Sequence, residues 1–283
     1  MENAKIIAVA NHKGGTGKTT TTCNLGTALA SEGKKVLLVD NDPQSNLTTA
    51  FGGEIPQDVM TLDKTLSLLM DDQEFPAKEK YILRGGRLDI IPSSLNLSTT
   101  EINLRDELGG EHTLSNLLNP LREDYDYILI DTNPSLGMLT INALAACDSV
   151  IIPVSPQLWS ATGLTALLDI ILKIKRKLNP RIIVSGILIT MTAEHTVLYR
   201  EAMELVNEYF SGQIGIFDAQ IPQSVGVGRA NFYSQSVMDF DAKNKAASAY
   251  AALAKEVIGN GDDSSQNSGQ TQAEQLERLA PTQ

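Results

Sequence analysis

The sequence predicts an α/β fold: a doubly wound, mostly parallel β-sheet of about seven or eight strands with helices on both faces. Short apolar runs alternate with segments of helical period, the order expected when a crossing helix joins each strand to the next. The runs are rich in Val and Ile and show little polar–apolar alternation, which is typical of strands covered on both faces. With 283 residues, 42% of them hydrophobic, the chain can bury a large core.

Runs of the strand type occur at intervals along the whole body of the chain. In order they are Lys5–Ala10, Lys35–Asp40, Arg87–Pro92, Tyr127–Asp131, Ser149–Val154, Ile182–Thr190 and Gly215–Ile221. Segments of helical period separate or follow them, among them Thr19–Ser31, Ala161–Leu178, Val197–Phe210 and Ala242–Ile258. The stretch Gly52–Tyr81 is the least patterned part of the body, and its details are not predicted.

The composition changes sharply at Gly259. From there the sequence GNGDDSSQNSGQTQ is polar, rich in Gly, Ser and Gln, and nearly free of apolar residues. Such a segment buries too little apolar surface to offset the entropy lost on ordering. We therefore predict one domain over residues 1–258 and a disordered polar tail over residues 259–283.

Composition also restricts the setting of the protein. Cys23 and Cys147 are far apart and have no C-x-x-C spacing, which favours a reducing cytoplasm over a disulfide framework. We expect no signal peptide and no membrane span, because no run approaches ~18 consecutive apolar residues. The net charge of −11 argues against a surface wholly devoted to nucleic acid, although it leaves room for a local basic patch.

The segment Asn11–Thr20 reads NHKGGTGKTT and lies between the first predicted strand and the first predicted helix. This context favours a phosphate-binding loop over a glycine-rich turn without a ligand. The glycines let the backbone curl so that its N–H groups form an anion nest, and the following helix adds its partial positive charge. Lys18 is placed to reach the β- and γ-phosphates, and the Thr19 hydroxyl is placed to bind Mg²⁺.

The loop departs from the usual G-x-x-x-x-G-K-[ST] pattern in one place. His12 stands where the first glycine is expected, and a second lysine, Lys13, follows it. We interpret His12 as a strand-end residue whose backbone turns into the loop, and not as a catalytic histidine.

Carboxylates follow two of the predicted strands. Asp131 ends the apolar run YILID, and Asp40 and Asp42 follow KVLLV, with Pro43 next in the chain. Carboxylates at these positions are suited to hold Mg²⁺ beside a bound nucleotide. Each aspartate alone could equally be a strand-end cap or a solvated turn residue. Together with the phosphate loop, they favour a nucleotide site.

The motifs KGGTGKTT, LLVDNDPQSN and ILIDTNPSLGMLTINALAACDSVIIPV together resemble the deviant Walker-type ATPases of the ParA/Soj/MinD class, a family of P-loop NTPases. The resemblance extends from about Ile6 to Ile258. The further segments ITM, AQIPQS and MDFDAKNKAASAYAALAKEV are most similar to the branch that partitions chromosomes and plasmids.

This resemblance implies that the chain binds ATP with Mg²⁺ and hydrolyses it. The implied nucleotide contacts come from the loop and from the segment IPQS: Lys13, Gly14, Gly15, Thr16, Gly17, Lys18, Thr19, Thr20, Pro222 and Ser224. Thr19, Asp42 and Asp131 are the implied metal-site residues, and Lys13, Lys18 and Asp42 the implied catalytic ones. Asp42 would orient the attacking water, with Asp40 supporting it.

By the same resemblance, Lys13 reaches across a dimer to the phosphates bound by the partner. A cation at the γ-phosphate lowers the barrier to phosphoryl transfer, as an arginine finger does elsewhere. Hydrolysis and ATP-dependent homodimerisation would then be coupled. The segment Thr132–Gly137 would be the second switch, and its Asn133 replaces the usual proline, which predicts a less constrained backbone.

The partition branch also binds DNA non-specifically through basic residues in the C-terminal part of the fold. This chain departs from that pattern, because Gln223 and Gly226 stand where arginines are usual. The run KIKRK at Lys173–Lys177 is interpreted either as part of a DNA surface or as a solvated helix face. The best remaining candidates for phosphate contacts are Arg229, Lys243 and Lys245.

Three functions remain open from the sequence. The first is a cytoplasmic partition ATPase that associates with the nucleoid when ATP-bound and is stimulated by a ParB-like protein. The second is a MinD-like or other ParA-like ATPase that positions a non-DNA cargo; a MinD-like membrane helix is disfavoured because Arg278 is the only basic residue of the tail. The third, an iron-protein reductase, would need cysteines at a dimer seam, whereas Cys23 and Cys147 are interpreted as small buried residues.

Overall fold

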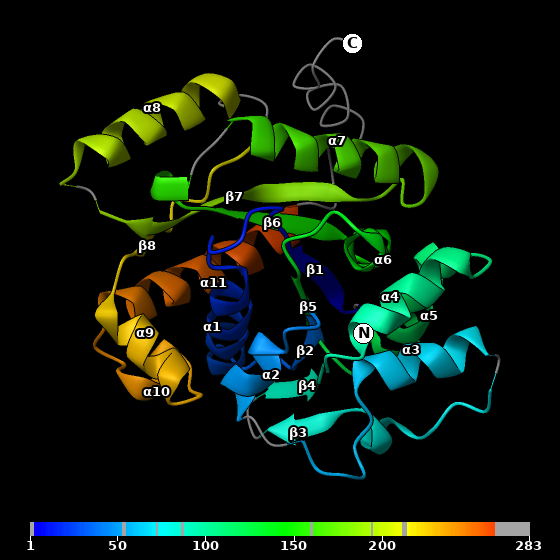
Figure 1. Cartoon of the computed structure of the whole chain (residues 1–283). Helices are drawn as coiled ribbons and strands as arrows, with labels where there is room; N and C mark the ends of the chain where they lie inside the picture. Colours follow the sequence, from blue (N-terminus) through cyan, green and yellow to red (C-terminus); the bar gives the residue numbers. More distant parts are fainter. Residues whose placement is uncertain are drawn as a thin grey trace.

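A computed structural model describes residues 3–52, 55–71, 73–85, 88–158, 161–193, 195–210 and 214–263. Its centre is an eight-stranded sheet in the order β3-β4-β2-β5-β1-β6-β7-β8, and all neighbouring strands are parallel except β3, which is antiparallel to β4 (Figure 1). The predicted α/β fold is confirmed. The strands are β1 (Lys5–Val9), β2 (Val36–Asn41), β3 (Leu83–Gly85), β4 (Leu88–Ile91), β5 (Tyr127–Thr132), β6 (Ser149–Val154), β7 (Ile183–Thr192) and β8 (Ile221–Pro222).

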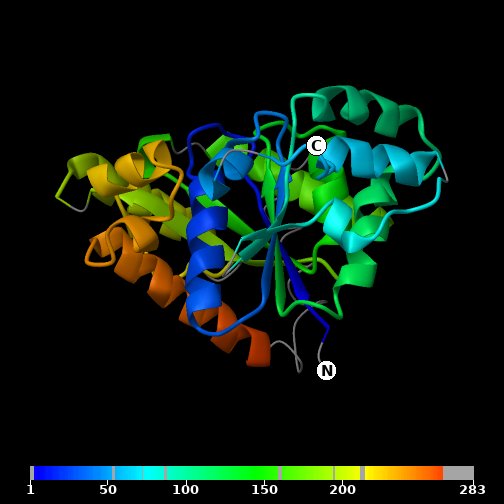
Figure 2. The same ribbon diagram turned by 90° about the horizontal axis from the view of Figure 1, so that it is seen from below.

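Helices cover both faces of this sheet (Figure 2). On one face lie α1 (Lys18–Ser31), α2 (Asn46–Phe51), α9 (Val225–Phe232), α10 (Val237–Phe240) and α11 (Lys245–Asp263). On the other lie α3 (Leu62–Met70), α4 (Leu97–Asp106), α5 (Thr113–Leu118), α6 (Met138–Ala146), α7 (Ala161–Lys177) and α8 (Val197–Phe210). Short 3₁₀ turns complete the chain at Lys78–Lys80, Gly110–His112, Asn119–Leu121 and Pro156–Leu158.

Strand periodicity explains the two layers, because successive side chains of a strand point to opposite faces. In β1, Ile6 and Ala8 belong to the core under α3–α8, whereas Ile7 belongs to the core under α1 and α11. In β5, Ile128 and Leu129 divide in the same way. Both faces of the central strands are therefore dry, as their unbroken apolar runs predict.

The prediction of a full strand at Gly215–Ile221 is wrong. In this segment the sheet continues as a single bridge between Ile216 and Ile187, and β8 contains just Ile221–Pro222. The amides of Asp218 and Ala219 donate instead to the carboxylate of Glu256 on α11, at 3.0 and 2.7 Å. A side chain distant in sequence thus takes the donors that a longer strand would offer to β7.

Two further regions were left open or bounded differently by the sequence. Within the weakly patterned stretch, the structure contains α3, whose Leu62 and Leu66 are fully buried. Helix α11 continues to Asp263, past the predicted start of the polar tail at residue 259, and residues 264–283 lie outside the described residues, as does Arg87 of the predicted third strand. None of the helices among the described residues combines the length and apolarity needed to cross a membrane.

Candidate nucleotide site

The predicted phosphate loop connects β1, at the centre of the sheet, to α1. Gly15 and Gly17 have φ angles of 75° and 86°, in the left-handed region, and Gly17 is the N-cap of α1. Residues with a side chain seldom adopt this conformation, so the two glycines account for the tight curl of the backbone. The arrangement aims the positive end of the α1 dipole at the loop, as an anion site requires.

The loop is held from two neighbouring strands. Asn11 Nδ2 donates to the Pro153 carbonyl of β6 at 2.7 Å, and Asn11 Oδ1 accepts from the Lys13 amide at 3.0 Å. Thr190 of β7 donates its hydroxyl to the Thr16 carbonyl at 2.9 Å. Asn11 and Thr190 were not among the predicted site residues. Asn11 begins the motif. Thr190 stands in the segment ITM of the family resemblance, but its local sequence does not show that it contacts Thr16, 174 residues away.

The two lysines of the loop differ in their surroundings. Lys18 is buried, and its Nζ donates to the Lys13 carbonyl at 3.1 Å. Burial lowers the pKa of Lys18, although the nearby Asp131 and Asp42 act in the opposite direction. Lys13 is half-buried at the outer part of the loop, next to the exposed Gly14 and Gly15. Lys18 is thus built into the loop, whereas Lys13 lies at its rim.

His12 is half-buried, and its Nδ1 atom has no hydrogen-bond partner among the described residues. Burial lowers the pKa of His12, and the charges of Lys13 and Lys18 lower it further. Both effects favour the neutral imidazole beside the loop, which suits the predicted structural role.

Asp131 lies at the heart of the site, and register explains its position. Paired strands place it beside Val9 of β1 and beside Asp40 of β2. Asp131 is fully buried; its Oδ1 atom accepts from Thr22 at 3.5 Å, and its Oδ2 atom has no partner among the described residues. Burial raises the pKa of Asp131 well above its usual range, and the charge of Asp40 raises it further.

Asp40 and Asp42 occupy different environments. Asp40 is fully buried and accepts from the amide and the hydroxyl of Thr48, at 2.8 and 2.6 Å. Burial raises the pKa of Asp40 to about 6, even though the hydrogen bonds from Thr48 and from the Asp42 amide favour its charged form. Asp42 lies on the turn after β2, and its Oδ1 atom accepts from the Gln44 amide at 2.9 Å.

This chemistry fits a nucleotide with Mg²⁺. Across the part of the chain that the structure describes, no three His, Cys, Asp or Glu side chains are grouped as a metal site of their own. Mg²⁺ commonly uses one or two carboxylates together with phosphates and water, so it needs no such cage. Asp131 offers a buried oxygen without a partner, and the half-buried Thr19 and Thr20 begin helix α1 nearby, where a cavity of about 290 Å³ opens toward α2 and α9.

Pro222 and Ser224 lie one strand beyond the loop contact. In β8, Ile221 pairs with Thr190 and Pro222 with Thr192 of β7, the strand that also holds Thr16. Ser224 caps α9: its hydroxyl accepts from the Gly226 amide and donates to Asn244, both at 3.1 Å. Contacts of Pro222 and Ser224 with an adenosine group therefore stay a prediction, although the two residues lie on the side of the site away from Asp40.

The predicted second switch, Thr132–Gly137, follows β5 directly. Asn133 is buried, and its Oδ1 atom accepts from the Thr140 hydroxyl at 3.1 Å, while the same hydroxyl also lies 2.6 Å from the Ser135 carbonyl. The Asn133 side chain thus accepts a hydrogen bond from α6, which a proline side chain could not do. The backbone freedom expected from the loss of proline is accordingly opposed by this contact.

The candidate basic residues lie at two opposite ends of the sheet. Lys243 and Lys245 are exposed where α11 begins, and Arg229 is exposed with its guanidinium 5.3 Å from the centre of the Phe240 ring. The run Lys173–Lys177 instead ends α7 beside the amino ends of the strands. Within it, Lys175 is buried and donates to the Ile182 carbonyl at 2.7 Å, so this lysine is structural.

Comparisons with known proteins agree with this geometry. A family model described as an AAA domain matches residues 4–184. The chain is 40% identical to the sporulation initiation inhibitor protein Soj of Bacillus subtilis over 257 residues, which cover 91% of this chain and 99% of Soj. It is 38% identical to the chromosome partitioning protein ParA of Caulobacter vibrioides strain NA1000 over 256 residues, 90% of this chain and 94% of that protein.

A solved structure shares the fold as well. The cobyrinic acid a,c-diamide synthase of Mycobacterium smegmatis, with a bound ATP analog and magnesium, superposes with a TM-score of 0.78 at 28% sequence identity. The match covers 92% of this chain and 97% of that one. The fold therefore occurs in proteins whose names state different functions.

Proposed function

Since the chain belongs to the ParA/Soj family of AAA-domain ATPases, we propose that it is an ATP-dependent homodimer that partitions DNA. The chain uses ATP and Mg²⁺ and hydrolyses the nucleotide. The proposal adds that ATP binding assembles the dimer, that the dimer binds DNA non-specifically in the nucleoid, and that a ParB-like protein stimulates hydrolysis. Plasmid, mobile element and chromosome all remain within the proposal as the DNA that is moved.

The observation that carries the proposal is that Lys18 is buried inside the phosphate loop, whereas Lys13 is half-buried at its outer part. Lys18 donates to the Lys13 carbonyl from inside the loop, where it is suited to a phosphate bound by its own chain. Lys13 lies at the rim of the same loop, where its side chain is suited to phosphates bound by a second copy. We assign Lys13 to hydrolysis in trans, so that catalysis depends on the dimer.

The roles of the other residues follow from their positions. Gly14–Gly17 and the start of α1 would cradle the phosphates, and Thr19 with Asp131 would hold Mg²⁺, which neutralises phosphate charge when bound. Asp42, on the turn after β2, would orient the attacking water by accepting a hydrogen bond from its O–H group. The buried position of Asp131 excludes bulk water and thereby strengthens these electrostatic contacts.

DNA binding is assigned to Arg229, Lys243 and Lys245. All three are exposed and lie on α9 and at the start of α11. Each phosphate contact adds salt-dependent affinity, and a dimer doubles the number of contacts. The name of the ParA relative, a chromosome partitioning protein, supports partition as the process that this chain serves.

The alternative with a specific observation in its favour is a ParA-like ATPase that positions a non-DNA cargo. Gln223 is exposed, and neither it nor Gly226 carries a charge where DNA-binding relatives are expected to have arginine. An iron–sulfur role has less support: Cys147 is buried at the amino ends of the strands, away from the loop, and burial raises the pKa of the Cys23 thiol to about 12.

The dimer is tested with Lys13→Ala. The variant is expected to bind ATP as the parent chain does, to remain monomeric with ATP, and to lose hydrolysis by about a thousandfold. Light scattering after size-exclusion chromatography measures the dimer, and phosphate release measures turnover. Parental turnover by Lys13→Ala would contradict catalysis in trans.

The DNA surface is tested by gel shift with ATP, with ADP and without nucleotide. Lys243→Ala/Lys245→Ala is expected to lose DNA retention and keep its ATPase activity, with a shallower dependence of affinity on salt. Lys173→Ala/Lys177→Ala removes the same charge at the opposite end of the sheet and serves as the matched control. An ATP-dependent dimer that retains no DNA at any salt concentration would favour the non-DNA cargo.

A further inference from the structure

We propose that Ser93 is a positioning residue for Asp42, acting through a closed ring of hydrogen bonds around the turn after β2. The inference rests on the proposed role of Asp42 in hydrolysis. Ser93 belongs to the loop Pro92–Leu95 that follows β4, outside every motif that identifies the nucleotide site. Its sequence separation from Asp42 is 51 residues, yet the two are directly bonded.

The ring contains one bond at each step. Ser93 Oγ donates to the Asp42 carbonyl at 2.8 Å, and the Ser93 amide donates to Thr48 Oγ1 at 2.9 Å. Thr48 Oγ1 in turn donates to Asp40 Oδ2 at 2.6 Å. Asp40 Oδ1 accepts from the Asp42 amide at 3.3 Å, which closes the ring on the residue where it began.

Burial gives these bonds their weight. Asp40, Asp42, Thr48 and Ser93 are 0%, 6%, 5% and 1% exposed, so water does not compete effectively for their donors and acceptors. The ring holds both the amide and the carbonyl of Asp42, and the Gln44 amide donates to its Oδ1 atom at 2.9 Å. The backbone and the carboxylate of Asp42 are thereby given one orientation.

The loop that carries Ser93 is itself anchored. Ser94 Oγ donates to Asp63 Oδ1 at 2.8 Å, and the Leu62 amide donates to the Pro92 carbonyl at 2.7 Å. Both contacts attach the loop to the start of α3. Ser93 therefore connects Asp42 to a packed helix, so we assign its hydroxyl a positioning role.

A water-positioning carboxylate loses rate steeply when its orientation is lost. Ser93→Ala removes the donor to the Asp42 carbonyl and opens the ring, while it leaves every phosphate-loop residue in place. We expect kcat for ATP hydrolysis to fall about tenfold, with the ATP dissociation constant within about twofold of the parent value. Ser93→Thr retains the hydroxyl and is expected to recover most of the rate.

The test measures kcat, ATP affinity and thermal midpoint for the full-length parent chain and for Ser93→Ala, Ser94→Ala and Thr48→Val. Ser94→Ala is the graded comparison: it removes one of the two contacts between the loop and α3 but leaves the ring closed, so its loss of kcat should be smaller than that of Ser93→Ala. Thr48→Val opens the ring at another step and is expected to lower kcat by a similar factor. The double variant Ser93→Ala/Thr48→Val should then be no slower than the slower single variant, because the ring is already open.

Three outcomes would overturn the proposal: a parental kcat for Ser93→Ala, equal losses in Ser93→Ala and Ser94→Ala, or multiplying losses in the double variant. Asp42→Ala separates this inference from the proposed function. If Asp42→Ala hydrolysed ATP at the parental rate, the role of Asp42 would fall together with that of Ser93. An inactive Asp42→Ala beside a fully active Ser93→Ala would overturn the positioning role alone.

Discussion

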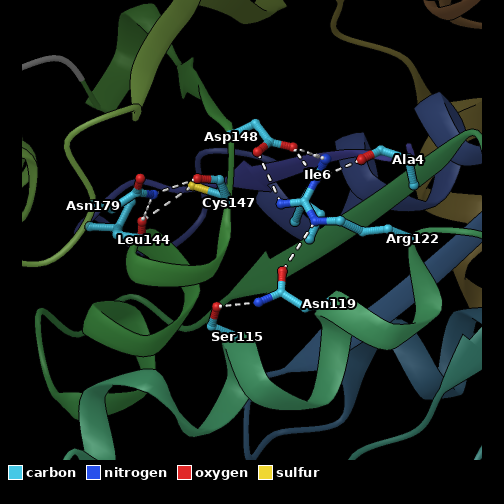
Figure 3. A network of polar contacts seen from close by, with 9 residues as sticks. All are labelled: Ala4, Ile6, Ser115, Asn119, Arg122, Leu144, Cys147, Asp148 and Asn179. Atoms are coloured by element: carbon cyan, nitrogen blue, oxygen red, sulfur yellow. Dashed lines mark hydrogen bonds and ion pairs between the residues drawn. The ribbon is translucent and has the colours of Figure 1, made fainter. Parts of the chain in front are cut away.

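Charged side chains are arranged differently at the two ends of the sheet. An ion pair lies at the amino ends of the strands, whereas buried carboxylates lie next to each other at the carboxyl ends. At the amino ends, Arg122 forms a double hydrogen bond with Asp148, with N–O distances of 2.7 and 3.0 Å. Asp148 also accepts from the Ile6 amide at 2.8 Å, and Arg122 donates to the Ala4 carbonyl at 2.7 Å (Figure 3). The network connects the starts of β1 and β6 to the turn before β5. Its carboxylate, that of Asp148, accepts from both a guanidinium and an amide.

At the carboxyl ends, the carboxylates face one another. Asp131 and Asp40 are paired in register on adjacent strands, and both are fully buried. Burial raises the pKa of each, and the charge of Asp40 raises the pKa of Asp131 further. Asp131 Oδ2 has no partner among the described residues, whereas Asp148 has partners for both oxygens. We infer that the ion pair at the amino ends stabilises the fold. The carboxyl ends retain buried carboxylates that suit a ligand, and these lower the free energy of unfolding.

The largest expected effect is at the phosphate loop. Lys18→Ala removes the buried cation of the carboxyl end and is expected to weaken ATP binding by about a hundredfold or more, because charged hydrogen bonds to phosphate are lost. Equilibrium binding of a fluorescent ATP analogue measures the effect. Arg122→Ala is the control from the other end, and it should bind ATP as the parent does. Equal losses in the two variants would remove the functional distinction between the ends.

Asp131→Asn tests whether the carboxyl end is kept at a cost in stability. Because the pKa of Asp131 is raised, its ionised form disfavours the folded state at pH 7.5, so the amide should increase the free energy of unfolding of the nucleotide-free protein by about 1 kcal/mol. Mg²⁺-dependent hydrolysis should fall at the same time. Denaturant unfolding and phosphate release give the two values. A variant both less stable and fully active would contradict the comparison.

Arg122→Ala should have the opposite pattern. It leaves Asp148 partly buried without its cation and is expected to destabilise the fold by about 2 kcal/mol, less than for a fully buried pair because both side chains retain some exposure. Hydrolysis per folded molecule should be unchanged. The same two assays used for Asp131→Asn measure it, and unaltered unfolding would show that the network contributes little.

The smallest effect is expected at the outer part of that network. Asn119 Oδ1 accepts from Arg122 Nε at 3.2 Å in an exposed position. Asn119→Ala should therefore cost about 0.5 kcal/mol or less. Chemical denaturation checks this value, and a loss as large as that of Arg122→Ala would mean that Asn119, and not the ion pair, organises the amino end.

Local patterns were enough to predict much of the site. NHKGGTGKTT places its loop between a strand and a helix because glycine conformation, helix capping and lysine position are all decided within ten residues. Asp131 was predictable in the same way, since it ends an apolar strand. The family resemblance added roles for Lys13 and Asp42 that the spacing alone does not imply.

Contacts beyond the segment itself explain what local patterns missed. The strand predicted at Gly215–Ile221 is replaced by bonds to Glu256, and the basic run Lys173–Lys177 contains a lysine that turns inward to the Ile182 carbonyl. Glu256 lies on α11, and Ile182 lies just before β7, so each partner is outside the segment whose pattern was interpreted. Periodicity reports on local environment and carries no information about such partners.

The sequence was enough to predict the class of fold, the phosphate loop and the positions of Asp40 and Asp131 at the ends of two strands. These features follow from short-range geometry and from the burial of apolar runs. The tertiary structure alone decided which groups meet: Ser93 with Asp42, Thr190 with Thr16, and Arg122 with Asp148. These contacts depend on strand register and helix packing across the whole sheet, which are established when the two hydrophobic cores form.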